Sequence, residues 1–188
     1  MASIALALTE DFADWEPALI TSVARGYLGV EIVTASPDGK PVTSMGGFRI
    51  MPDMAYDALD PDRFDALVIP GGLSWEKGRA PDFTDIVHRF RAGNRVVAGI
   101  CAASSALAAT GVLNHVAHTG NALESHRKHE AYQGAEHYRD QPQAVSDKGI
   151  ITARGSSPVT FTAEILKALD LWSPEAESEI AAFSAEHR

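Results

Sequence analysis

Cysteine is almost absent from this chain, since the 188 residues include only Cys101. A single cysteine excludes an internal disulfide framework and is typical of proteins kept in a reducing compartment. Basic residues are outnumbered, with 16 Lys and Arg against 25 Asp and Glu, so the net charge of −9 gives no support for binding nucleic acid. No apolar run approaches the ~20 residues of a membrane span. The amino terminus shows no secretion signal. We therefore expect a cytoplasmic protein with no nucleic-acid or membrane partner.

The composition that remains is that of an ordinary globular protein. Hydrophobic residues make up 45% of the chain and charged residues 22%. A length of 188 residues is ample for one sizeable core. No low-complexity linker and no internal repeat divides the sequence, so we expect a single domain over residues 1–188.

Short apolar runs alternate with helical patterns along most of the chain. Repeated units of this kind predict a three-layer α/β sandwich with a mostly parallel sheet. Two segments, 42–53 and 143–155, favour small hairpins instead, the second because of its Asp-Lys-Gly turn. The expected buried strands are 3–8, 30–36, 65–72 and 95–100, and the expected helices are 14–26, 81–93, 102–111, 157–172 and about 174–188.

Cys101 lies where a predicted strand, "RVVAGI", meets a predicted helix, "AASSALAATG". Ligands of such sheets bind at the carboxyl ends of the strands, and a residue at a tight strand-to-helix turn projects into that cleft. The positive end of the helix dipole makes a thiol there easier to ionise. The N–H groups of Ala102 and Gly72 are candidates for an oxyanion hole. A free cysteine is commonly just a small buried residue, but this position favours a reactive thiol.

Three motifs in order carry a family resemblance: "ALVIPGG", "VVAGICAASSALAATGVL" and "IITARGSSPVTFTAEIL". Together with "HTGN", the sequence resembles the superfamily of PfpI and the Parkinsonism-associated deglycase ("DJ-one"), which is related to class I glutamine amidotransferases. The resemblance spans residues 3 to about 171. It implies a flavodoxin-like sandwich, a cysteine in a strained nucleophile elbow, and a homodimer or larger assembly.

The resemblance also implies roles for individual residues. Cys101 matches the elbow cysteine, and Glu16 matches the acid that lies under the sulfur in many members. A carboxyl group in a desolvated cleft beside a thiolate would stay protonated and donate a hydrogen bond to it. The alternative for Glu16 is a solvated acid in the first turn of a helix. His118, 17 residues after the cysteine, resembles a histidine that relays protons in several members.

Departures from the family pattern count against two of the activities found in this family. Peptidase members carry a histidine directly after the cysteine, where this chain has Ala102. Isocyanide-hydrating members resemble "CTG" at the elbow and carry an aspartate in place of Glu16. Both activities are therefore disfavoured. A zinc site is also disfavoured, because the segment that contains its candidate ligands reads as a charged, solvated helix face; these candidates are His126, His129, Glu130 and His137. We predict no metal and no required cofactor.

Two functions of different classes remain open. The first is a glyoxalase-like or deglycase-like enzyme of stress defence, a hydrolase or lyase in which Cys101 attacks the carbonyl of a small molecule. The second is a redox sensor or chaperone-like stress protein in which the same thiol is oxidised. Both rely on the same reactive sulfur, because nucleophilic attack and oxidation both proceed through the thiolate.

Overall fold

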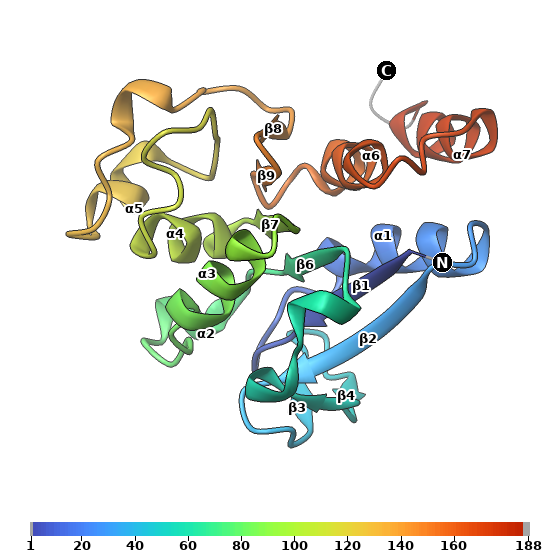
Figure 1. Cartoon of the computed structure of the whole chain (residues 1–188), viewed down its shortest axis with the longest axis horizontal. Helices are drawn as coiled ribbons and strands as arrows, with labels where there is room; N and C mark the ends of the chain where they lie inside the picture. The colour runs from blue at the N-terminus through green and yellow to red at the C-terminus, as the bar shows by residue number, and fades with distance from the viewer. Residues whose placement is uncertain (1, 186–188) are drawn as a thin grey trace.

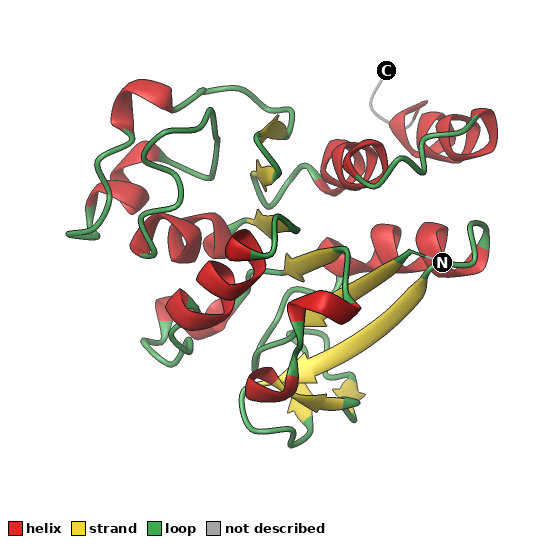
Figure 2. Cartoon of the chain, viewed as in Figure 1, coloured by secondary structure: helices red, strands yellow, loops and turns green. Residues whose placement is uncertain are grey.

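A seven-stranded sheet forms the middle of the molecule, whose computed structural model describes residues 2–185 (Figure 2). The strand order is β5-β2-β1-β6-β7-β9-β8, and every pairing is parallel except the antiparallel pair of β8 and β9. The strands are β1 (Ser3–Ala7), β2 (Glu31–Ser36), β5 (Met54–Ala55), β6 (Ala66–Ile69), β7 (Val96–Ile100), β8 (Val145–Asp147) and β9 (Ile150–Ala153).

Helices cover both faces of this sheet (Figure 1). One layer contains α1 (Trp15–Gly26), α6 (Pro158–Ala168) and α7 (Pro174–Ser184). The other contains α3 (Thr84–Ala92) and α4 (Ala102–Ala109). The predicted α/β sandwich with a mostly parallel sheet is therefore confirmed. The predicted last helix ends at Ser184 in α7, and residues 186–188 lie outside the described part of the chain.

Continuous apolar runs form the central strands because both faces of the sheet are covered. Every residue of β1, β6, β7 and β9 is buried. One core packs Ile20 of α1 against Phe161 of α6, and the other packs Phe90 of α3 against Leu107 of α4. These two cores hold the helices against the two faces of the sheet. The carboxyl ends of the four central strands therefore lie together at one edge of the sheet.

Both predicted hairpins are present. The first is a separate two-stranded sheet of β3 (Val42–Thr43) and β4 (Arg49–Ile50). The second joins β8 to β9 through Lys148 and Gly149, which have φ of +48° and +76°. Two positive φ values suit the tight turn of a two-residue hairpin.

Several short elements have no counterpart in the sequence analysis: α2 (Leu73–Glu76) and three single turns of 3-10 helix, η1 (Tyr56–Ala58), η2 (Pro61–Arg63) and η3 (Ala135–His137). The helix expected around His126 and His129 is present only as α5 (Leu123–Arg127), which ends before His129. Elements this short carry no full hydrophobic period, so pattern alone does not reveal them. No helix in residues 2–185 is long and apolar enough to cross a membrane.

Candidate functional site

The candidate site lies where four neighbouring parallel strands end. The chain that leaves β1 enters α1 and delivers Glu16, and β6 is followed by Gly71. The next two strands, β7 and β9, are followed by Cys101 and by Gly155. Because β1, β6, β7 and β9 are adjacent in the sheet, these four residues meet at one edge.

Cys101 occupies a strained turn between β7 and α4. Its φ is +61° and its ψ is −125°, a conformation that is rare for a residue with a side chain. Its N–H donates to the carbonyl of Ala153 at 2.9 Å, which continues the pairing of β7 with β9. The strain persists because the flanking strand and helix are held by buried packing, and it directs the sulfur out of the sheet. This is the geometry of a nucleophile elbow.

Two glycines leave room for the elbow. A Cβ on Gly71 would lie 2.7 Å from the Ala102 nitrogen and 2.8 Å from the Cys101 Cβ. A Cβ on Gly155 would lie 2.7 Å from Sγ itself. A larger residue at Gly71 would therefore collide with the backbone of the elbow, and one at Gly155 would collide with the sulfur.

Glu16 is completely buried beside the sulfur. Its Oε2 accepts a hydrogen bond from the Gly71 N–H at 2.5 Å. Its Oε1 lies 3.3 Å from the position that a Gly155 Cβ would occupy, on the same side as Sγ. The structure thus brings Glu16 to Cys101 and does not place it on a solvated first turn.

Glu16 and Cys101 titrate as a pair. Burial raises the pKa of the Glu16 carboxyl from 4.5 to about 7, opposed by hydrogen bonds from Cys101 and Gly71. Burial, and then the charge on Glu16, raise the pKa of the Cys101 thiol from 9.0 to about 11. The pair therefore loses one proton near pH 7 and the second only near pH 11, and carries a single negative charge between them. The helix dipole predicted a thiol that ionises more easily than a free cysteine, but burial raises the pKa of Cys101 instead.

Asn121 is a site residue that the sequence analysis missed. Its Nδ2 donates to Sγ at 3.2 Å, and its Oδ1 accepts from the Gly155 N–H at 2.9 Å. The Ala102 N–H is a second donor to the sulfur, and both hydrogen bonds lower the pKa of the thiol. Asn121 belongs to the "HTGN" motif, but the sequence analysis considered only the histidine there.

Gly72 lies against the first loop rather than against the elbow. Its φ is +151°, and a Cβ would collide with the carbonyl of Asp11. Its N–H donates to no acceptor among residues 2–185. That free donor keeps Gly72 a candidate for the oxyanion hole, beside Ala102.

A cavity of about 310 Å³ opens above the sulfur. One wall comes from α4 and its elbow, and the opposite walls come from α2 and the segment around α5. The lining residues are Trp75, Glu76, Cys101, Ala102, Ser104, Ser105, Asn121, Ser125, Lys128 and His129. The size suits a small molecule, and the lining is largely polar.

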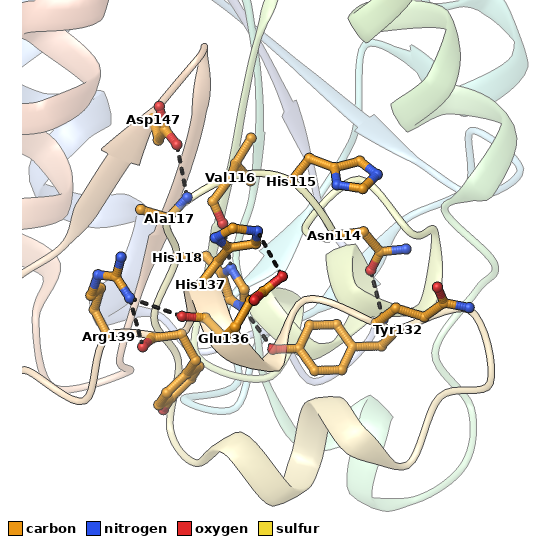
Figure 3. Close-up of polar contacts among 12 residues, drawn as sticks. Asn114, His115, Val116, Ala117, His118, Tyr132, Glu136, His137, Arg139 and Asp147 are labelled. Carbon is orange, nitrogen blue, oxygen red and sulfur yellow. Dashed lines mark hydrogen bonds and ion pairs between the residues drawn. The ribbon is translucent and has the colours of Figure 1, made fainter.

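His118 is not brought to the sulfur. It is fully buried, with Nδ1 at 2.8 Å from the carbonyl of Val116 and Nε2 at 2.8 Å from the hydroxyl of Tyr132 (Figure 3). Burial lowers the pKa of its imidazole. Both ring nitrogens are therefore engaged away from Cys101, and His118 is not among the residues that line the cavity with the thiol.

The histidines of the α5 segment differ from their predicted state. His126 was expected on a solvated face but is completely buried, 3.2 Å from the Ser104 hydroxyl. Burial lowers the pKa of His126 to about 4. His129 is half-buried, with Nε2 at 2.8 Å from the Ser105 hydroxyl. Within residues 2–185, no three His, Cys, Asp or Glu side chains are grouped so as to hold a metal ion.

Comparison with known proteins gives a consistent family. The sequence model described as the DJ-1/PfpI family matches residues 2–168. A crystal structure of a DJ-1 superfamily protein from Agrobacterium tumefaciens is 66% identical, superimposes with a TM-score of 0.99 and covers 100% of both chains.

Curated relatives carry names of two kinds. An uncharacterized protease, YdeA of Bacillus subtilis, is 33% identical over 171 residues, which is 89% of this chain and 83% of the relative. The deglycase PfpI of Pyrococcus furiosus is 34% identical over 86 residues, 45% of this chain and 52% of its own length.

Proposed function

The chain belongs to the DJ-1/PfpI family, and from that premise we propose that it is a cysteine-dependent enzyme of stress defence, of glyoxalase or deglycase type, acting on small reactive carbonyls. The observation that carries the proposal is the pair of Cys101 at a strained elbow and the fully buried Glu16, both of which lie against the Gly155 backbone. A strained elbow and a cavity of about 310 Å³ place this pair within reach of a small substrate.

In the reactive form the sulfur carries the charge and Glu16 carries the proton. Two N–H groups, from Asn121 and Ala102, donate to the sulfur, and the amino terminus of α4 favours an anion there. The Glu16 side chain is fully buried, whereas Cys101 is only partly buried and faces the cavity. Charge on the fully buried carboxylate therefore costs more than charge on the better-solvated sulfur.

A 2-oxoaldehyde fits this chemistry. The sulfur forms a bond to the aldehyde carbon, and the carbonyl electron pair moves to oxygen, where the N–H groups of Gly72 and Ala102 stabilise it. Glu16 then gives its proton to that oxygen to form a hemithioacetal. The resulting carboxylate removes a proton from the former aldehyde carbon, which gives an enediol, and returns that proton to the adjacent carbon. The hydroxyl proton on the former aldehyde oxygen passes to the neighbouring oxygen as the C=O bond of the 2-hydroxyacyl thioester forms. Water hydrolyses the thioester and restores the thiol. The balance is addition of one water, with no external oxidant or reductant.

The residues around Cys101 are less suited to peptide hydrolysis. A peptide bond is a weak electrophile, and its leaving amine must be protonated by a placed general acid. Ala102 stands where peptidase members have a histidine, and His118 is held by Tyr132 and Val116. The proposal therefore favours dicarbonyls over proteins.

The test compares wild type with Cys101→Ser on methylglyoxal and on casein. We expect the wild type to convert methylglyoxal to lactate and Cys101→Ser to be inactive, with no cleavage of casein by either. Cysteine-dependent cleavage of casein would replace the proposal with a peptidase. No turnover of either substrate, together with selective oxidation of Cys101 by peroxide, would replace it with a redox sensor.

A further inference from the structure

We propose that His129 is the general base that activates water for hydrolysis of the Cys101 thioester, with Ser105 orienting its imidazole. The inference rests on the proposed function and assigns a residue to its last chemical step. Among the residues that line the cavity above Cys101, His129 is the one whose side chain ordinarily titrates near neutral pH.

Ser105 links His129 to the wall of the cavity that holds the sulfur. Ser105 in α4, Cys101 at the elbow before that helix and His129 all line the same cavity. The Ser105 hydroxyl lies 2.8 Å from His129 Nε2. The imidazole therefore borders the same cavity of about 310 Å³ as the sulfur, and a thioester and a water fit in that volume.

The hydrogen-bond chain selects a tautomer. The Ser105 hydroxyl donates its hydrogen to the carbonyl of Ser125 at 3.0 Å, so its oxygen accepts from His129 at Nε2. An imidazole that carries its hydrogen on Nε2 has a lone pair on Nδ1. That nitrogen has no hydrogen-bond partner within residues 2–185. A held nitrogen on one side and a free basic nitrogen on the other is the arrangement of a general base.

The step balances without any further reagent. Nδ1 takes a proton from water, and the hydroxide forms a bond to the thioester carbon. The carbon–sulfur bond then breaks, the 2-hydroxy acid leaves, and the electron pair returns to Cys101. The imidazolium gives its proton back to the pair of Cys101 and Glu16, which restores the resting state.

The electrostatic surroundings keep His129 in its basic form. Burial, and then the positive charge of Lys128, lower the pKa of its imidazole below the ordinary 6.5. The other titratable groups that face it are Glu76 across the cavity, Cys101 on the elbow, and buried His126. The neutral imidazole is therefore the main form at pH 7.

The experiment mixes methylglyoxal with wild type, His129→Gln and His115→Gln, and follows both lactate and the mass of the Cys101 peptide. His115 is an exposed histidine of the same region, outside the cavity, and serves as the matched control. General bases contribute about 10²- to 10⁴-fold. We expect His129→Gln to form about one acyl adduct per chain and then to turn over at least about 100-fold more slowly. His115→Gln should match wild type.

A second variant guards against a folding artefact. Ser105→Ala keeps the imidazole but removes the hydroxyl that orients it. We therefore expect the acyl adduct on Cys101 to accumulate, but less than in His129→Gln. Ser105→Thr restores a hydroxyl and should bring the amount of adduct back to that of the wild type. Wild-type turnover in His129→Gln, or lost turnover without an adduct, would overturn the assignment to thioester hydrolysis. A wild type that consumes no methylglyoxal would instead reject the proposed function, and the assignment with it.

Discussion

Replacing Glu16 by Gln separates the two groups of the buried pair. Gln keeps the shape and an N–H₂ donor that can face the sulfur, but it carries neither the proton nor the charge of the carboxyl. The sulfur would then titrate alone. Its pKa would lose the contribution of the Glu16 charge but keep the effect of burial, which is the largest cause of the rise to about 11. We therefore expect the thiol of this variant to ionise between its ordinary 9.0 and about 11.

The size of the effect follows from the first ionisation of the pair. In the wild type that step lies near pH 7, so at pH 8 about nine tenths of the pairs are charged. The proposed function requires this charge to reside on the sulfur. With a thiol pKa of 9.0 or above, a tenth or less of the variant is thiolate at pH 8. Because only the thiolate reacts, alkylation at pH 8 should slow by about tenfold or more.

The assay is the rate of iodoacetamide alkylation of Cys101 from pH 5 to 10. The wild-type rate should rise as pH passes through about 7, when the pair loses its first proton, and Glu16→Gln should show this rise only above pH 9. Asp14→Asn is the control, since Asp14 precedes the same helix and its carboxylate accepts from the Gly46 N–H instead. Equal or faster alkylation of Glu16→Gln at pH 8 would show that the charge of the pair resides on the carboxylate, which refutes the reasoning.

Two further predictions concern space at the elbow and the surface of the protein. Gly155→Ala should displace Sγ from Glu16, because the new Cβ would lie 2.7 Å from the sulfur and hydrogen bonds with Trp15 and Asn121 hold the Gly155 backbone in place. The alkylation rate of Cys101 should then lose its rise near pH 7. Gly26→Ala is the control and should keep that rise, because a Cβ on Gly26 would have nothing within 4 Å. Light scattering should find a homodimer of about 40 kDa, because Trp15 and Phe48 expose 49% and 67% of their surface; a 20.1 kDa species at micromolar concentration would contradict this.

Most of the fold could be predicted because its central strands follow one rule. Residues of β1, β6 and β7 are buried on both faces of the sheet, so each appears in the sequence as an unbroken apolar run followed by turn residues. The β8–β9 hairpin could be predicted equally well, because its turn sequence contains Lys148 and Gly149, which adopt the two positive φ values that the turn needs. By contrast, α2 and α5 span only four and five residues and are stabilised by tertiary contacts rather than by a periodic pattern of their own.

The candidate site around Cys101 could be predicted from the sequence only in part, for a different physical reason. The position of Cys101 follows from chain connectivity, since a strand-to-helix junction is local in sequence. The contact of Asn121 with the sulfur and that of Ser105 with His129 join residues 20 and 24 positions apart. Such contacts depend on how the loop after α4 folds back over the helix, and that loop has no hydrophobic period. His118 illustrates the same limit. Its resemblance to a family histidine predicted a position near Cys101, but its Nε2 is hydrogen-bonded to the Tyr132 hydroxyl instead.

The chemistry of the sulfur depends as much on absent side chains as on present ones. The Gly71 N–H reaches Glu16 and the Gly155 backbone reaches Asn121, and both approaches need a residue without a Cβ. These two backbones exclude water from one side of the sulfur, which explains why burial dominates the pKa of both acids in the pair. The other side opens to the cavity. Under the proposed function, a substrate would meet a sulfur whose charge is stabilised by fixed N–H groups and a proton held on Glu16, so the carbonyl addition would need little reorganisation.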